Sequence, residues 1–166
     1  MKNTIQALSL ALALASPFTM SLTALAQEEI TRPVLVQEVA QSDEELQTFG
    51  FSEYNYWDAR VLSEFWGTSV LEAKATIGRK LGFGAENKAY LRQNLLDAQL
   101  KALSRVDELK LYADSGYGYE DAASLATFWG DSSPWESKLR IERNLIMGDD
   151  EVIREALRLA RQEPGC

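Results

Sequence analysis

Carboxylates and lysines recur in this sequence at spacings that could support acid–base or nucleophilic chemistry. Asp58 is followed by Lys74, and the same two residue types return as Asp121 and Lys138. A lysine held in an apolar setting beside a carboxylate can act as a nucleophile. The chain contains no histidine, which excludes Ser-His-Asp and Cys-His catalysis and His-ligated zinc. Acid–base chemistry would therefore depend on carboxylates.

The two acid–lysine pairs belong to a longer internal repeat. Residues 54–67 return as residues 117–130, with 8 of 14 positions identical. After one inserted residue the match continues from 69–84 to 133–148. Residues kept in both copies are expected to serve the fold of the unit, so function is sought among the residues that differ.

The repeated segments have the pattern of helices with defined ends. Asn55 fits the N-cap of the first helix, and Gly118 takes its place in the second copy. Ser69 and Ser133 each begin a Ser-x-x-Glu capping box for a second helix. The expected stop residues are Gly67 and Gly130 for the first helix and Gly84 and Gly148 for the second.

A third helix is expected from about Asn87 to Tyr112 in the first copy and from about Asp150 to Gln162 in the second. The longer one carries a broad apolar stripe, which predicts a spine packed by both copies. The stripe comprises Leu91, Leu95, Ala98, Ala102, Val106 and Leu109, widened by Leu96, Leu100 and Leu103.

These patterns predict an all-α fold. We expect two tandem three-helix units that form one compact domain and share a long helix. The expected boundaries are an N-terminal arm over 27–50, unit 1 over 51–112 and unit 2 over 113–163.

The first 26 residues have the pattern of a cleaved signal peptide. Lys2 gives a positive start, residues 5–15 are apolar, and Ala-Leu-Ala at 24–26 fits a cleavage site. The apolar stretch is broken at Ser16 and is too short for a membrane span. We therefore expect an exported bacterial protein in the periplasm or the medium, with no stable membrane span after cleavage.

The charge and the cysteine content of the chain limit the kinds of partner that the protein is expected to bind. The chain has 17 basic and 25 acidic residues and a net charge of −8, whereas nucleic acid and anionic lipid favour basic surfaces. Cys166 is the only cysteine, so an internal disulfide is excluded and a disulfide-linked dimer is conceivable but not favoured. Neither acidic cluster, at 43–45 or 149–151, has EF-hand spacing. No metal or cofactor is expected.

Helical projection directs Asp58, Asp121, Lys74 and Lys138 toward the cores of their own units. An isolated buried charge costs several kcal/mol, so each acid is expected to meet a lysine. We predict structural ion pairs Asp58–Lys74 and Asp121–Lys138, in preference to a catalytic lysine.

Four aromatic residues have no aromatic counterpart in the other copy: Trp57, Phe83, Tyr90 and Trp135. Projection around the first helix places Trp57 away from the shared apolar face. Because Trp and Tyr are enriched at binding hot spots, we expect Trp57, Tyr90 and Trp135 to contact a partner. The alternative is that these rings pack between the units or against residues 27–50.

The resulting prediction is a non-catalytic module that binds an envelope or secreted protein or peptide. One alternative is a small enzyme that acts on cell-wall polymers through paired carboxylates. Another is a periplasmic protein that binds a small ligand or a cation. No residue is singled out as catalytic.

Overall fold

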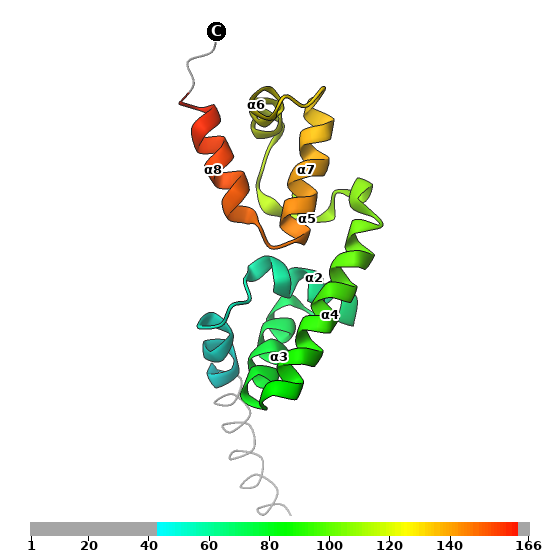
Figure 1. Cartoon of the computed structure of the whole chain (residues 1–166), viewed down its shortest axis with the longest axis vertical. Helices are drawn as coiled ribbons and strands as arrows, with labels where there is room; N and C mark the ends of the chain where they lie inside the picture. Colours follow the sequence, from blue (N-terminus) through cyan, green and yellow to red (C-terminus); the bar gives the residue numbers. More distant parts are fainter. Residues whose placement is uncertain (1–42, 163–166) are drawn as a thin grey trace, which may run out of the picture. The chain divides into compact units, whose positions relative to one another are not determined.

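The computed structural model describes residues 43–162, and every element in this range is helical (Figure 1). The all-α class is therefore confirmed for these residues. The predicted signal peptide and residues 27–42 of the predicted arm lie outside the described range. Within it, no helix has both the length and the apolar character that a membrane crossing requires. The elements are a helix over 43–50, α2 (Tyr56–Trp66), α3 (Val70–Gly82), α4 (Ala85–Leu103), the 3₁₀ helix η1 (Val106–Glu108), α5 (Lys110–Ser115), α6 (Tyr119–Trp129), α7 (Pro134–Ile146) and α8 (Asp150–Ala160).

The ends of α2 and α6 are those predicted. The Asn55 side chain accepts hydrogen bonds from two amides of the first turn of α2, and the Asp58 carboxylate accepts one from the Asn55 amide at 2.9 Å. In α6 the Gly118 amide donates to Asp121 at 2.9 Å in the same way. Gly67 follows α2 with φ of 70°, a conformation that glycine adopts without strain.

The starts of α3 and α7 are also as predicted, with one difference. Ser69 and Glu72 form a full capping box, in which the Ser69 amide donates to the Glu72 carboxylate at 2.9 Å. The Ser133 hydroxyl caps α7, but the Glu136 carboxylate accepts from the Ser132 amide, one residue earlier. The second capping box is therefore only half formed.

The long third helix of the first copy is predicted wrongly beyond Leu103, over about its last third. α4 ends at Leu103, and the chain continues as η1 and α5. Leu109, which precedes α5, has a left-handed backbone with φ of 51°. The Glu142 carboxylate of α7 accepts hydrogen bonds from the amides of Leu111 and Tyr112 and so caps α5. These contacts replace the amide–carbonyl bonds that a continuous helix would have made.

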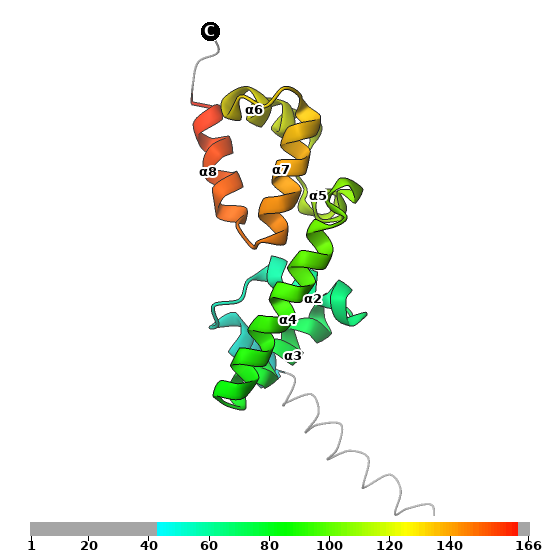
Figure 2. The same ribbon diagram turned by 45° about the vertical axis from the view of Figure 1, so that its right-hand side comes forward.

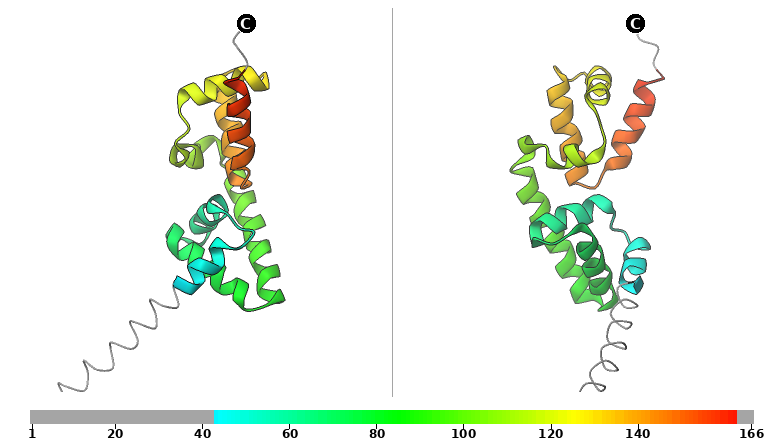
Figure 3. Two further views of the ribbon diagram at one scale, coloured as in Figure 1. Left: turned by 90° about the vertical axis from the view of Figure 1, so that its left-hand side faces the viewer. Right: turned by 180° about the vertical axis from the view of Figure 1, so that it is seen from behind.

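Apolar side chains from all of these helices form one core cluster. α2 packs against α3 and α4, while α6, α7 and α8 pack against one another, as Figure 3 shows from two further sides. α7 also contacts α5, η1, α2 and α4. The central element is therefore α7, and not the long helix that the apolar stripe predicted.

The segments that match in sequence form helices of matching length. α2 and α6 each have 11 residues, and α3 and α7 each have 13. A further short helix precedes each pair, the helix over 43–50 and α5, and it ends with the same hydrogen bond. The Ser52 hydroxyl donates to the Phe49 carbonyl at 2.7 Å, and the Ser115 hydroxyl donates to the Tyr112 carbonyl at 2.7 Å. A short helix thus precedes each of the two matching segments.

Candidate binding surfaces

Trp57 is not available to a partner, so its prediction as a binding residue is wrong. Its side chain belongs to the core cluster and is 8% exposed. Its ring meets the Tyr56 ring edge-on, with 5.0 Å between centroids. Projection around α2 alone missed this burial because α2 contacts α3, α4 and α7, which cover more than one of its sides.

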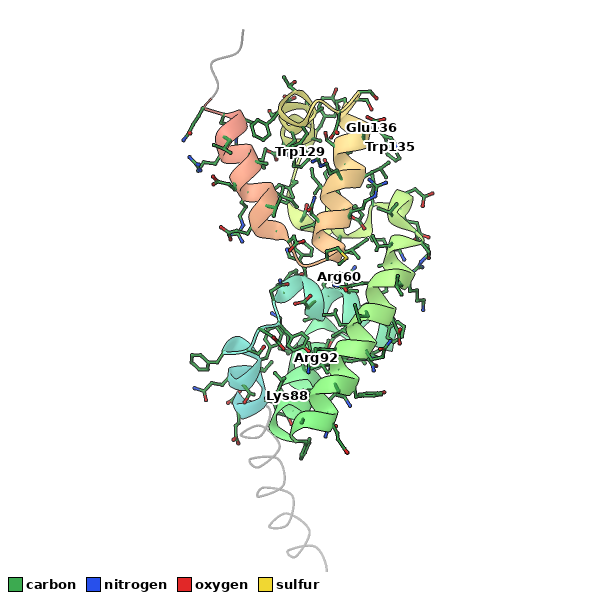
Figure 4. The ribbon with its side chains drawn as sticks, viewed as in Figure 1. Arg60, Lys88, Arg92, Trp129, Trp135 and Glu136 are labelled. Carbon is green, nitrogen blue, oxygen red and sulfur yellow. The ribbon has the colours of Figure 1, made fainter. Side chains whose placement is uncertain are left out.

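Tyr90 and Trp135 are exposed, as expected for binding residues, but they belong to different surfaces. Tyr90 lies on α4, and the Lys80 ammonium lies 4.6 Å from its ring centroid. Trp135 lies in the first turn of α7, one turn before Lys138 (Figure 4). The remaining unmatched ring, Phe83, is 68% exposed between α3 and α4.

The predicted ion pairs Asp58–Lys74 and Asp121–Lys138 do not occur among the salt bridges of residues 43–162. Asp58 caps its own helix, and Asp121 caps α6 and pairs with Arg161 at 2.8 Å. A carboxylate at the third position of a helix satisfies an orphan amide within its own chain segment. The buried Asp58 and the partly exposed Asp121 therefore both have partners without the lysines.

Lys74 lies instead over aromatic rings. Its ammonium nitrogen is 5.6 Å from the Phe49 ring centroid and 5.1 Å from the Tyr56 ring centroid. The negative face of an aromatic ring attracts such a cation. Leu71, one turn earlier on α3, is 61% exposed, and Tyr56 is 45% exposed. We call these four residues the Lys74 surface.

The same arrangement recurs around Lys138. Its ammonium nitrogen is 5.3 Å from the Tyr112 ring centroid and 5.6 Å from the Tyr119 ring centroid. Tyr119 is 60% exposed, and Trp135 stands where the first copy has Leu71. We call these four residues the Lys138 surface. Each of the two surfaces therefore presents a cation, a tyrosine hydroxyl and an exposed apolar side chain.

Neither lysine forms a salt bridge with any described residue. Both lysines are partly exposed, and the described residues leave the positive charge of each without a carboxylate partner. Subtracting the repeated residues missed both surfaces, because Lys74, Lys138, Tyr56 and Tyr119 are kept in both copies. The sequence match gives no information about which of these repeated side chains are exposed, and that information is needed to recognise the two surfaces.

The buried carboxylates are already engaged in the fold. Burial raises the pKa of the Asp58 carboxyl, the hydrogen bond from the Asn55 amide opposes this rise, and the nearby Asp149 carboxylate adds to it. Burial likewise raises the pKa of the Glu142 carboxyl, against the lowering effect of the two α5 amides. Both carboxylates cap helices, which leaves neither free to act on a bound polymer.

A groove between α6 and α8 has a volume of about 490 Å³. It is lined by Arg154, Arg158 and Arg161 and by a single carboxylate, Asp121. Each arginine already pairs with a carboxylate. The groove thus does not have the two facing carboxylates of a glycosidase.

No group of three or more cysteine and carboxylate side chains in residues 43–162 is arranged to hold a metal ion. Comparison of the chain with protein-family models, curated proteins and solved structures finds no match. Function is therefore inferred from the two lysine surfaces themselves.

Proposed function

We propose that this protein is an exported, non-catalytic binding module of the bacterial envelope that recognises a protein or peptide partner. One observation carries the proposal: the Lys74 and Lys138 surfaces each present a lysine without a carboxylate partner, over aromatic rings and beside exposed apolar side chains. The ammonium can bind a carboxylate, while the rings supply the large, rigid contact area typical of hot spots. The proposed ligand is a segment that carries a carboxylate next to an apolar side chain.

The net charge of the protein restricts this ligand further. At −8, the chain repels strongly acidic partners at long range. The two lysines are local positive sites within that field. The recognised carboxylate therefore belongs to a segment that is otherwise neutral or basic.

We further propose that the described helices are two tandem copies of one four-helix unit. The support is the 63- to 64-residue sequence match, the equal lengths of α2 and α6 and of α3 and α7, and the paired lysine surfaces. Two equivalent surfaces on one chain can bind two segments of one partner, which strengthens binding without new kinds of contact. The signal-peptide pattern of residues 1–26 supports placement in the periplasm or the medium.

The test is a quantitative pull-down from an envelope extract of the source bacterium. The bait proteins are the wild type, the double variant Lys74→Gln/Lys138→Gln, and the control Lys88→Gln, which removes one lysine charge on α4. Circular dichroism confirms that each bait is folded. We expect a protein that is retained by the wild type and the control and lost from the double variant. Equal recovery of every protein by all three baits contradicts the proposal.

A further inference from the structure

The outward face of α4 carries apolar side chains that the described chain leaves exposed. Leu96 is 53% exposed and Leu100 is 66% exposed. Leu91 and Ala98, on the opposite side of the same helix, are 0% and 2% exposed. In Figure 2, α4 runs across the front of α2 and α3 with no other helix in front of it. Leu96 and Leu100, two of the three side chains that widened the predicted stripe, therefore face away from the core, whereas Leu103 packs against it.

These exposed positions have heptad spacing. The exposed Ala89 and Leu96 are seven residues apart, and so are the exposed Gln93 and Leu100, while the half-buried Leu103 follows Leu96 by seven residues. The first set occupies d positions and the second set a positions of a two-stranded coiled coil. The buried Leu91 and Ala98 then fall at f, directly opposite the seam. The two earlier a positions of α4 hold the polar residues Glu86 and Gln93, so the apolar part of the seam lies toward the C-terminal end of the helix.

The charged residues beside the row fit a parallel pair of identical helices. In this register Arg92 is at g and Asp97 is at e, five residues later. In a parallel coiled coil a g residue faces the e residue five positions later on the partner helix, so Arg92 and Asp97 would pair twice across a two-fold axis. In an antiparallel pair, g residues face g residues and this complementarity is lost. Neither side chain has a salt bridge among the described residues, where Asp97 accepts only a hydrogen bond from Gln93.

We infer that the protein forms a parallel homodimer through α4, with Leu96 and Leu100 at its centre and reciprocal Arg92–Asp97 pairs at its flanks. Because α4 is already folded in the monomer, dimerisation orders side chains but no new helix. The seam is only about two heptads long, and interfaces of that size are weak. The dimer therefore forms at micromolar or higher protein concentration. This surface is separate from the Lys74 and Lys138 surfaces, so the inference does not depend on the proposed function.

The test is sedimentation velocity of the mature chain from micromolar to millimolar concentration. A reductant is present throughout, so that a Cys166 disulfide cannot contribute. We expect a concentration-dependent monomer–dimer equilibrium that Leu96→Glu and Leu100→Glu each abolish. The control Val152→Glu changes a 54% exposed apolar residue on α8 and leaves the dimer intact. Circular dichroism confirms the fold of each variant.

A charge exchange tests the parallel arrangement. Arg92→Asp and Asp97→Arg each place like charges across the seam and should weaken the dimer at least tenfold. The double variant Arg92→Asp/Asp97→Arg restores opposite charges and should recover most of the lost affinity. A monomer at all concentrations, a dimer that survives Leu96→Glu, or a double variant as weak as the single ones overturns the inference. The first of these outcomes would leave the α4 face to a helix of a different protein.

Discussion

Trp57 and Trp135 contribute differently to stability, although both are aromatic residues without an aromatic counterpart in the other copy. Trp57 lies in the core, whereas Trp135 is 51% exposed. Trp57→Ala leaves a cavity and should lower the free energy of unfolding by about 3–5 kcal/mol. Trp135→Ala should lower it by less than about 1 kcal/mol, since surface substitutions have small effects. Urea denaturation followed by circular dichroism measures both, and equal losses would contradict these positions.

Asp58 makes stability depend on pH in a defined direction. Burial is the largest cause that raises the pKa of its carboxyl in the folded state. The stabilisation by the protonated form is complete below the unfolded pKa of about 3.9 and is lost as pH rises through the folded value. Asp58→Asn keeps the cap acceptor but cannot ionise. Its free energy of unfolding, relative to the wild type, should therefore increase between about pH 4 and pH 7. Urea denaturation at both pH values tests this, and an unchanged difference would contradict it.

The residue roles that were predicted correctly from the sequence are helix caps, which depend on hydrogen bonds between residues close together in the chain. Asn55 and Ser69 cap helices through amides two or three positions away, so their roles follow from local spacing. The burial of Trp57 and the position of Lys74 over Phe49 depend on how separate helices pack. Helical projection describes one helix at a time and contains no information about that packing.

At the scale of elements, Gly78 of α3 allows the helix over 43–50 to pack closely. A Cβ at Gly78 would lie 1.9 Å from the backbone oxygen of Glu45. Gly78→Ala should therefore displace the helix over 43–50 and speed amide exchange there, while α6 keeps its protection. Gly82→Ala is the matched control, because a Cβ at that end of α3 meets nothing within 4 Å. Hydrogen exchange read by mass spectrometry distinguishes the two, and equal protection of 43–50 in both variants would contradict the close packing.

The break between α4 and α5 shows why an apolar stripe overestimates a helix. The stripe continues past Leu103 to Val106 and Leu109, so periodicity alone extends the helix. The chain turns because the carboxylate of Glu142, distant in sequence, accepts hydrogen bonds from the first amides of α5. The stripe also treated Leu96 and Leu100 as core. A helix face that is buried in the core and an apolar helix face that is exposed have the same sequence pattern.

At the scale of the whole described domain, a charge network joins α2 to the segment around α5. The guanidinium of Arg60, labelled in Figure 4, pairs with Asp114 at 2.8 Å. Glu64 pairs with Arg105 at 2.9 Å and with Lys110 at 2.8 Å. The hydrogen bond from Lys110, and then the interactions with Arg105, lower the pKa of the Glu64 carboxyl despite its partial burial. We call the helix over 43–50, α2, α3 and α4 the first set of helices, and α5, α6, α7 and α8 the second set. The charge network and the contacts of α7 indicate that the two sets depend on each other for stability.

Asn55 provides a further link, which can be separated from its capping role. Its side-chain amide donates to the Gly148 carbonyl between α7 and α8 at 2.8 Å. Asn55→Gly reproduces the N-cap residue of α6 and loses only a few tenths of a kcal/mol as a cap. The lost hydrogen bond should add about 0.5–1.5 kcal/mol, measured by urea denaturation. Asn55→Ala, which is also a poor cap, should lose more. Equal stability of Asn55→Gly and the wild type would contradict the link.

If the two sets of helices support each other, residues 43–162 unfold in one transition. The four tryptophans allow each set to be observed separately, because Trp57 and Trp66 lie on α2 while Trp129 lies on α6 and Trp135 on α7. Trp129→Phe/Trp135→Phe confines tryptophan fluorescence, excited at wavelengths that tyrosine does not absorb, to α2, and Trp57→Phe/Trp66→Phe confines it to α6 and α7. In each variant the urea midpoint from fluorescence should coincide with the midpoint from circular dichroism, which observes all helices. A fluorescence midpoint that departs from the circular dichroism midpoint in either variant would show that α7 and the charge network do not couple the two sets.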